Sequence, residues 1–136
     1  MKEKKYIKLI EEAKAAAKSS RSKYSKFAVG SAVLCANGKI YRGANIENAS
    51  YGLTNCAERS ALFNAASAGE KNIEAVAVWT KSGNVFPCGA CRQVILELAP
   101  RADVVINKSN KDIVVVNIED LLPYCFSKKD LKKINN

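Results

Sequence analysis

Three cysteines and one glutamate are spaced in a way that could hold a reactive metal ion. Cys56 lies two residues before Glu58 in "TNCAERSALFNAA", and Cys88 and Cys91 lie three residues apart in "FPCGACRQVILELA". Both stretches have the pattern of a helix start, where free N–H groups and the helix dipole favour the thiolate that binds metals. If both helix starts lie at the same edge of a sheet, the three thiolates meet beside Glu58.

The number of cysteines distinguishes between kinds of zinc site. A structural zinc ion takes four protein ligands, whereas a catalytic one takes three and leaves a position for water. The chain has no histidine, and of its five cysteines only Cys35 and Cys125 could supply a fourth ligand. The pattern therefore favours one catalytic Zn²⁺ per chain, with Glu58 moving protons. Two alternatives stay open: a structural zinc site that includes Cys35 or Cys125, and a thioredoxin-like dithiol of Cys88 and Cys91.

Glu58 and Arg59 each have a structural explanation as well as a chemical one. Asn55 is a favourable N-cap, which would make Glu58 the N3 residue of a capping box. Three thiolates with zinc leave one net negative charge, which Arg59 could offset by donating hydrogen bonds to the sulfurs. The alternative for Arg59 is an ordinary surface position. Arg92, directly after Cys91, fits either explanation equally.

Hydrophobic periodicity predicts the elements that must position these residues. An amphipathic helix is expected at 3–19, with Tyr6, Ile10, Ala13 and Ala17 on its apolar face. A hairpin should turn at Asn37-Gly38. We expect further helices at 55–68, 91–99, 118–123 and 127–134, and strands at 73–79, 102–107 and 112–117. This order predicts one α/β domain, 1–136: a mixed sheet of about five strands between helices on both faces, an α/β/α sandwich.

Composition places the chain among globular proteins. Its 136 residues are 48% hydrophobic and 26% charged, which suits one domain with an ordinary core. No stretch has the length of a signal peptide or a membrane span, so we expect a cytoplasmic protein without a membrane partner. An odd number of cysteines, five, argues against a disulfide framework.

The net charge of +9 suggests a nucleic-acid partner, but the excess lies at the two ends. Residues 1–26 hold nine Lys and Arg against three acids, and residues 127–136 hold four against one. Residues 27–126 hold nine of each. An enzyme acting on polynucleotides needs a basic groove beside its site, so we expect no nucleic-acid partner. The Lys-rich ends are explained as solvated helix faces.

Four motifs in register resemble the cytidine deaminase family, in particular its small homo-oligomeric members with a three-cysteine zinc site. They are "FAVGSAVL", "GANIENASYGLTNCAER", "PCGACRQVILE" and "LLPYCFSKKDL", which together cover most of residues 27–132. A first ligand, one residue and a glutamate, followed by P-C-x-x-C, is the pattern of zinc deaminases, with cysteine here in the histidine position. The chain departs from the family around "YGLTN" and in the tail "SKKDLKKINN".

The resemblance implies a role for each matched residue. Cys56, Cys88 and Cys91 would bind Zn²⁺, Glu58 would be catalytic, and Arg59 would support the sulfurs. Asn45 and Glu47 would bind the ribose hydroxyls, and two phenylalanines would flank the pyrimidine, one of them from a neighbouring subunit of a homotetramer. The implied substrate-binding residues are Phe27, Asn45, Ile46, Glu47, Ala57 and Phe126, with Phe126 as the residue from the neighbour. Taken alone, the phenylalanines are typical of core packing, and Asn45 and Glu47 of a solvated strand face.

The implied reaction is the hydrolysis of cytidine, and of 2'-deoxycytidine, to uridine or deoxyuridine and ammonia, in pyrimidine salvage. A phosphate near the carboxylate of Glu47 would be repelled in a closed pocket, so nucleosides should be accepted and nucleotides rejected. The alternative within the family is a deaminase of another cytosine-bearing nucleoside, such as an antibiotic. Arg59 and Phe126 favour the ordinary nucleoside enzyme.

Overall fold

A five-stranded mixed sheet forms the centre of the molecule, a computed structural model that describes residues 2–108 and 112–135. The strands lie in the order β2-β1-β3-β4-β5. Only β3 and β4 pair in parallel; the other neighbouring strands are antiparallel. Their bounds are β1 (Val29–Cys35), β2 (Ile40–Ala44), β3 (Ile73–Thr80), β4 (Asp103–Asn107) and β5 (Ile113–Asn117).

The predicted hairpin joins β1 and β2. Leu34 pairs with Ile40 beside the turn, and Gly38 has a φ of +88°, a left-handed conformation that glycine adopts without steric cost. Because β3 also runs antiparallel to β1, β2 and β3 point the same way and end at the same edge of the sheet. The segment that leads to Cys56 and Glu58 starts from this edge, and so does the segment that leads to Cys88 and Cys91.

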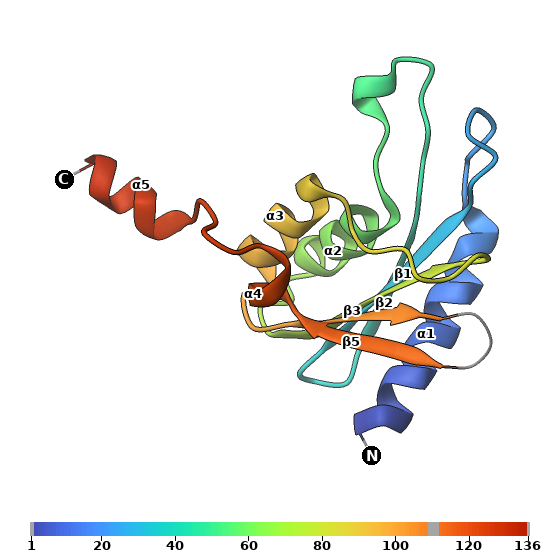
Figure 1. Cartoon of the computed structure of the whole chain (residues 1–136), viewed down its shortest axis with the longest axis horizontal. Coiled ribbons are helices and arrows are strands. Elements are labelled where there is room, and N and C mark those ends of the chain that lie inside the picture. The colour runs from blue at the N-terminus through green and yellow to red at the C-terminus, as the bar shows by residue number, and fades with distance from the viewer. Residues whose placement is uncertain (1, 109–111, 136) are drawn as a thin grey trace.

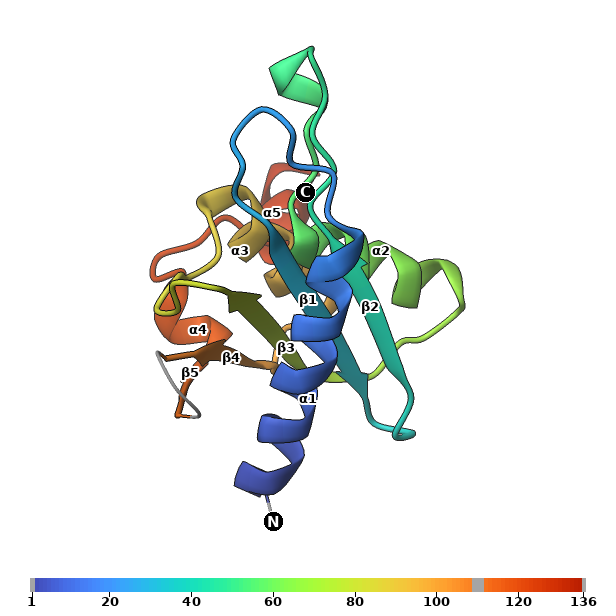
Figure 2. The ribbon, with the colours of Figure 1, turned by 90° about the vertical axis from the view of Figure 1, so that its right-hand side faces the viewer.

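Helices cover both faces of the sheet (Figures 1 and 2). α1 (Lys2–Ala16), continued by the short turn η1 (Ala17–Ser19), packs on one face. α2 (Ala57–Ser67) and α3 (Gly89–Leu98) pack on the other. The remaining elements are η2 (Tyr51–Leu53), α4 (Ile118–Leu121) and α5 (Lys128–Asn135), the last of which projects away from the sheet (Figure 1). The predicted α/β/α architecture is confirmed, and within the described residues no helix has the length and apolar content to span a membrane.

Strand alternation divides the core into two clusters. On β3, Val76 and Val78 face α2 and α3, whereas Ala75 and Ala77 face α1. The predicted apolar face of α1 is buried throughout. Both helix layers approach the sheet closely at glycines: a Cβ at Gly30 would lie 1.9 Å from the Ala13 carbonyl oxygen, and one at Gly43 would lie 2.2 Å from the Ala61 nitrogen.

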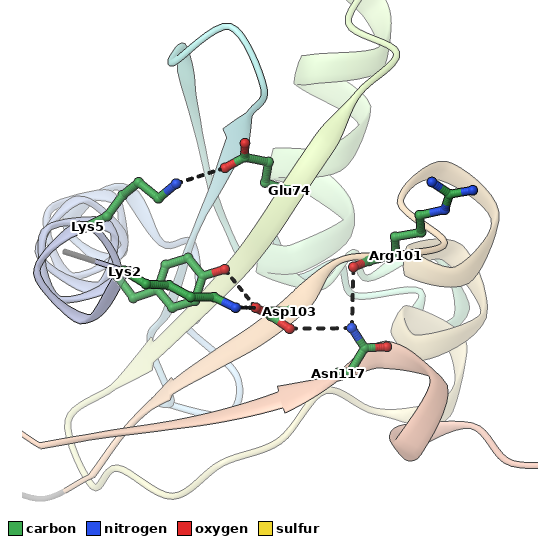
Figure 3. A network of polar contacts seen from close by, with 7 residues as sticks. Lys2, Lys5, Glu74, Arg101, Asp103 and Asn117 are labelled. Carbon is green, nitrogen blue, oxygen red and sulfur yellow. Dashed lines mark hydrogen bonds and ion pairs between the residues drawn. The ribbon is translucent and has the colours of Figure 1, made fainter.

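A polar network ties the start of α1 to the amino ends of β3 and β4 (Figure 3). Lys2 pairs with Asp103 at 3.0 Å, and Lys5 pairs with Glu74 at 3.1 Å. The Tyr6 hydroxyl donates to Asp103 at 2.8 Å, and the Asn117 amide reaches the same carboxylate at 3.3 Å. A cavity of about 1170 Å³ opens here, at the edge of the sheet opposite the helix starts that carry the cysteines.

Candidate active site

Three cysteines meet at the starts of α2 and α3. Cys56 is the N-cap of α2 and Cys88 the N-cap of α3, which follow β2 and β3 from the same edge of the sheet. The sulfur atoms of Cys56, Cys88 and Cys91 all lie within 4.8 Å of one another, and those of Cys56 and Cys88 are 3.9 Å apart. The structure thus brings together residues that lie 32 positions apart in the chain.

The other two cysteines stand apart from this group. Cys35 is buried in the core cluster under α2 and α3, and Cys125 follows α4. Within residues 2–108 and 112–135, neither belongs to the metal-ligand group. A structural site with Cys35 or Cys125 as fourth ligand therefore does not fit this geometry.

The protonation of the thiols indicates what the group can bind. Hydrogen bonds from Cys91 and then from Arg59 lower the pKa of Cys56 to about 5. The pKa of Cys91 is raised, first by its hydrogen bond to Cys56 and then by burial. These contacts therefore favour a thiolate at Cys56 and a protonated thiol at Cys91 while no cation lies between them. Sulfur donors in this number and spacing fit Zn²⁺.

α2 begins one residue later than the capping-box interpretation requires. The backbone of Asn55 pairs with Ile46 through two hydrogen bonds of 2.9 Å, which hold Asn55 in an extended bridge. Cys56 is the N-cap of α2, and its side chain makes no capping hydrogen bond. The Asn55 amide donates to the Ser60 hydroxyl at 3.2 Å. The capping-box interpretation of Asn55 and Glu58 is therefore wrong.

Glu58 is a buried carboxyl group in the first turn of α2. It is 5% exposed, and burial raises its pKa above the ordinary carboxyl value; the negative charge of Cys56 acts in the same direction. A carboxyl group with a raised pKa can both accept and donate a proton near neutral pH. Its position beside the sulfurs suits a proton carrier.

Two arginines follow cysteines, and the structure gives them different surroundings. Arg59 donates to the Cys56 sulfur at 3.3 Å, as expected from the need to offset thiolate charge. Arg92 instead donates to the backbone carbonyls of Pro87 at 2.8 Å and Leu121 at 2.9 Å. Arg92 thus fastens the segment before Cys88 to the end of α4.

Asn45 and Phe27 are linked just beyond the sheet. Asn45 is 8% exposed; its Oδ1 accepts from the Val29 N–H at 3.0 Å and from the Ser20 hydroxyl, and its Nδ2 donates to the Phe27 carbonyl at 2.8 Å. The interpretation of Asn45 as part of a solvated strand face is wrong, because Asn45 is buried and its amide bonds to the backbone of Phe27 and Val29. The core expectation for Phe27 is also wrong: its side chain is 41% exposed.

Glu47 borders a pocket of about 380 Å³, whose lining includes Tyr24 and Tyr51. Its Oε1 accepts from the backbone N–H groups of Tyr24 at 3.0 Å and Ser25 at 3.1 Å, and its Oε2 accepts from the Ser25 hydroxyl. The Ser25 hydroxyl, with these backbone donors, lowers the pKa of Glu47. Sequence analysis missed Ser25; its position two residues before Phe27, whose N–H it caps at 3.1 Å, is a local signal for such a turn.

The remaining predicted substrate residues differ in exposure. Ile46 is 41% exposed, whereas Ala57 is fully buried. Phe126 lies between α4 and α5 and is 55% exposed, held by a hydrogen bond of 2.9 Å from Gln93 to its carbonyl. The core-packing interpretation is therefore also wrong for Phe126, because more than half of this residue is exposed.

Comparisons with known proteins agree with this geometry. The family model of the cytidine and deoxycytidylate deaminase zinc-binding region matches residues 3–108. The cytidine deaminase of Halalkalibacterium halodurans is 48% identical over 125 residues, 90% of this chain and 95% of that protein. The cytidine deaminase of Sporosarcina psychrophila is 48% identical over 126 residues, 91% and 93% of the two chains.

Solved structures of the same family have the same fold. A cytidine deaminase crystal structure from Burkholderia pseudomallei superposes with a TM-score of 0.84 at 48% identity, covering 88% of this chain and 97% of that one. One from Mycobacterium tuberculosis gives a TM-score of 0.76 at 34% identity, covering 88% and 95%. These matches confirm the resemblance noted in the motifs: the chain belongs to the cytidine and deoxycytidylate deaminase family.

Proposed function

We propose that the chain catalyses the hydrolytic deamination of cytidine to uridine and ammonia. The observation that carries the proposal is Glu58, a buried carboxyl group in the same helix turn as one of three clustered sulfurs. Family membership and the curated relatives named cytidine deaminase support cytidine as the substrate. We extend the proposal to 2'-deoxycytidine and to a role in pyrimidine salvage.

One Zn²⁺ per chain would be held by Cys56, Cys88 and Cys91, with a position left for water. What the metal supplies when bound is activation of that water near neutral pH. Arg59 donates to Cys56, and two helix N-termini point at the site, so the negative charge of three thiolates is partly offset.

Glu58 carries the protons of the reaction. It takes a proton from the attacking water and delivers it to ring N3, which makes C4 electrophilic. The water oxygen then bonds to C4, and Glu58 takes the remaining proton of that hydroxyl and passes it to the exocyclic nitrogen. The C4–N bond breaks, ammonia leaves, and the C4 oxygen becomes the carbonyl of uridine. A raised pKa suits a group that must hold a proton between these two transfers.

The substrate would be held by two polar and two aromatic side chains. The Asn45 Nδ2 uses one hydrogen on the Phe27 carbonyl and keeps the other for a ribose hydroxyl. Glu47 would accept a second hydroxyl, and Phe27 and Phe126 would flank the pyrimidine. Ile46 would line the pocket with its side chain, and the buried Ala57 would lie behind it at the start of α2. A carboxylate at this position also repels phosphate, so nucleotides would be excluded.

We further propose a homotetramer in which Phe126 enters the site of a neighbouring subunit. The Phe126 ring is half exposed, and Tyr51 and Leu53 in η2 are 77% and 70% exposed. Contact with neighbouring subunits would cover these apolar side chains. We take residues 1–136 as a single catalytic domain working in the cytoplasm, where thiol ligands stay reduced.

The first test is cytidine turnover by purified, zinc-loaded protein, followed by the ultraviolet change as uridine forms. A zinc chelator should abolish it. Glu58→Gln should lower kcat by about 10²–10⁴-fold while zinc stays bound. The control is Glu97→Gln, the same change at an exposed carboxylate on α3, which should leave kcat unchanged.

Two other outcomes would change the proposal. Bound zinc without cytidine turnover would move the substrate to another cytosine-bearing nucleoside. Turnover of cytidine monophosphate as fast as cytidine would contradict the role given to Glu47.

A further inference from the structure

A third cavity lies across the sheet from the cysteines, on the face covered by α1. It measures about 540 Å³ and is lined by the end of α1, the segment before β1 and the end of β3. Its apolar lining includes Trp79, Phe27 and Ala17. Trp79 is the chain's only tryptophan and packs against the core cluster beneath α1. The cavity therefore has an aromatic side chain fixed against the core.

The charges around this cavity all have one sign. Among the residues that the structure describes, its lining includes no acidic residue and four lysines: Lys14, Lys18, Lys26 and Lys81. In the part of the chain that the structure describes, the three ion pairs involve Lys2, Lys5 and Arg42, and none of the four cavity lysines. Lys14 and Lys18 are one helical turn apart, a spacing at which like charges repel. An anion between them would relieve this repulsion.

The side chain of one of these lysines and the backbone of another make further contacts. The Lys14 Nζ lies 5.9 Å from the centroid of the Trp79 ring, which places a cation beside the aromatic surface. Lys26 has a φ of +60°, a left-handed conformation unusual for lysine, held by a hydrogen bond of 2.8 Å from its N–H to the Ser22 carbonyl. Cations and an aromatic ring thus border the same open pocket.

We propose that this cavity binds a nucleoside phosphate, with the phosphates on the lysines and the base against Trp79. A simple inorganic anion would leave the apolar lining unused, and a neutral nucleoside would leave four positive charges uncompensated. The site is separate from the substrate position of the proposed deaminase, although Phe27 borders both. Three of its four lysines lie in residues 1–26, so it gives a role to part of the excess charge there.

The test uses zinc-loaded full-length protein and uridine 5'-triphosphate as the probe. Fluorescence of the single tryptophan reports stacking directly, and equilibrium dialysis gives the affinity independently. Uridine 5'-triphosphate should quench Trp79 and bind more tightly than either uridine or inorganic triphosphate. Since a charge-assisted hydrogen bond to phosphate is worth about tenfold or more, Lys14→Gln with Lys18→Gln should weaken binding by about tenfold or more.

The matched control is Lys4→Gln with Lys8→Gln. It removes the same charge at the same spacing from α1, outside the cavity, and should leave the affinity within about twofold because distant exposed charges are screened by salt. Circular dichroism should show all variants folded.

Three results would overturn the proposal. If inorganic triphosphate bound as tightly as uridine 5'-triphosphate, the base would not contact Trp79. If Lys4→Gln with Lys8→Gln weakened binding as much as Lys14→Gln with Lys18→Gln, the binding would be general charge attraction. Much tighter binding of a single-stranded oligonucleotide would indicate a polynucleotide surface instead. Because the readout needs no turnover, each of these results leaves the deaminase proposal standing.

Discussion

Gly43→Ala should disturb the active site through the packing of α2 on the sheet. A Cβ at Gly43 would lie 2.2 Å from the Ala61 nitrogen and 2.7 Å from the Ala57 carbonyl oxygen, where ordinary contacts need about 3.4 Å. Helix α2 must therefore shift by about 1 Å, and Cys56 and Glu58 shift with it, since they lie at its start. A misplacement of about 1 Å can cost about 10²-fold in turnover, and the overpacking itself costs about 1–3 kcal/mol of stability.

The assay pairs this variant with Gly30→Ala, which overpacks the opposite face of the sheet. Its Cβ would lie 1.9 Å from the Ala13 carbonyl oxygen, so α1 and not α2 has to move. Both variants should show a lower urea midpoint, but only Gly43→Ala should lose zinc faster to a chelator and lose kcat. Equal zinc loss in both variants, or full zinc retention and turnover in folded Gly43→Ala, would refute the reasoning.

Three further predictions concern stability and the metal. Although burial acts the other way, hydrogen bonds from Tyr6 and Lys2 hold the pKa of Asp103 below its ordinary value. Its contribution to stability is therefore full above the ordinary carboxyl pKa and is lost as pH falls through the folded-state pKa, so Asp103→Asn should flatten the acid side of a plot of urea midpoint against pH. Asn107→Ala should cost about 1–3 kcal/mol in urea unfolding, because it leaves the buried N–H and C=O of Thr80, bonded to the amide at 3.1 and 2.8 Å, without partners. Zinc removal should abolish turnover yet leave the far-ultraviolet circular dichroism largely unchanged, since neither described core cluster includes a proposed zinc ligand. Loss of the helical signal on zinc removal would show instead that the metal maintains the fold.

The fold could be predicted from the sequence because its signals are local. Apolar periodicity located α1 and the strands, and the Asn37-Gly38 pair located the hairpin. The order of these elements leaves few sensible arrangements, so the mixed sheet between two helix layers followed from them. The grouping of Cys56, Cys88 and Cys91 followed in turn, because both helix starts come after strands that end at one edge.

Interpretations that depended on distant partners were less successful. Taken without the resemblance, Asn45 fits a solvated strand face, but it is buried because its amide bonds to Phe27 and Val29, which precede it by 18 and 16 residues. Arg59 and Arg92 follow cysteines in the same way, yet one contacts a sulfur and the other the carbonyl of Leu121, 29 residues away. Local sequence does not distinguish such pairs.

The sequence by itself determined the chemistry of this protein: the residue types that can hold zinc and move protons, and the family to which it belongs. Only the tertiary structure decided which side chains are exposed, that Asn55 does not cap α2, and that lysines from three separate segments surround Trp79. The physical reason is that reactivity depends on residue type and short spacing, whereas burial and pairing depend on which surfaces the folded chain brings into contact.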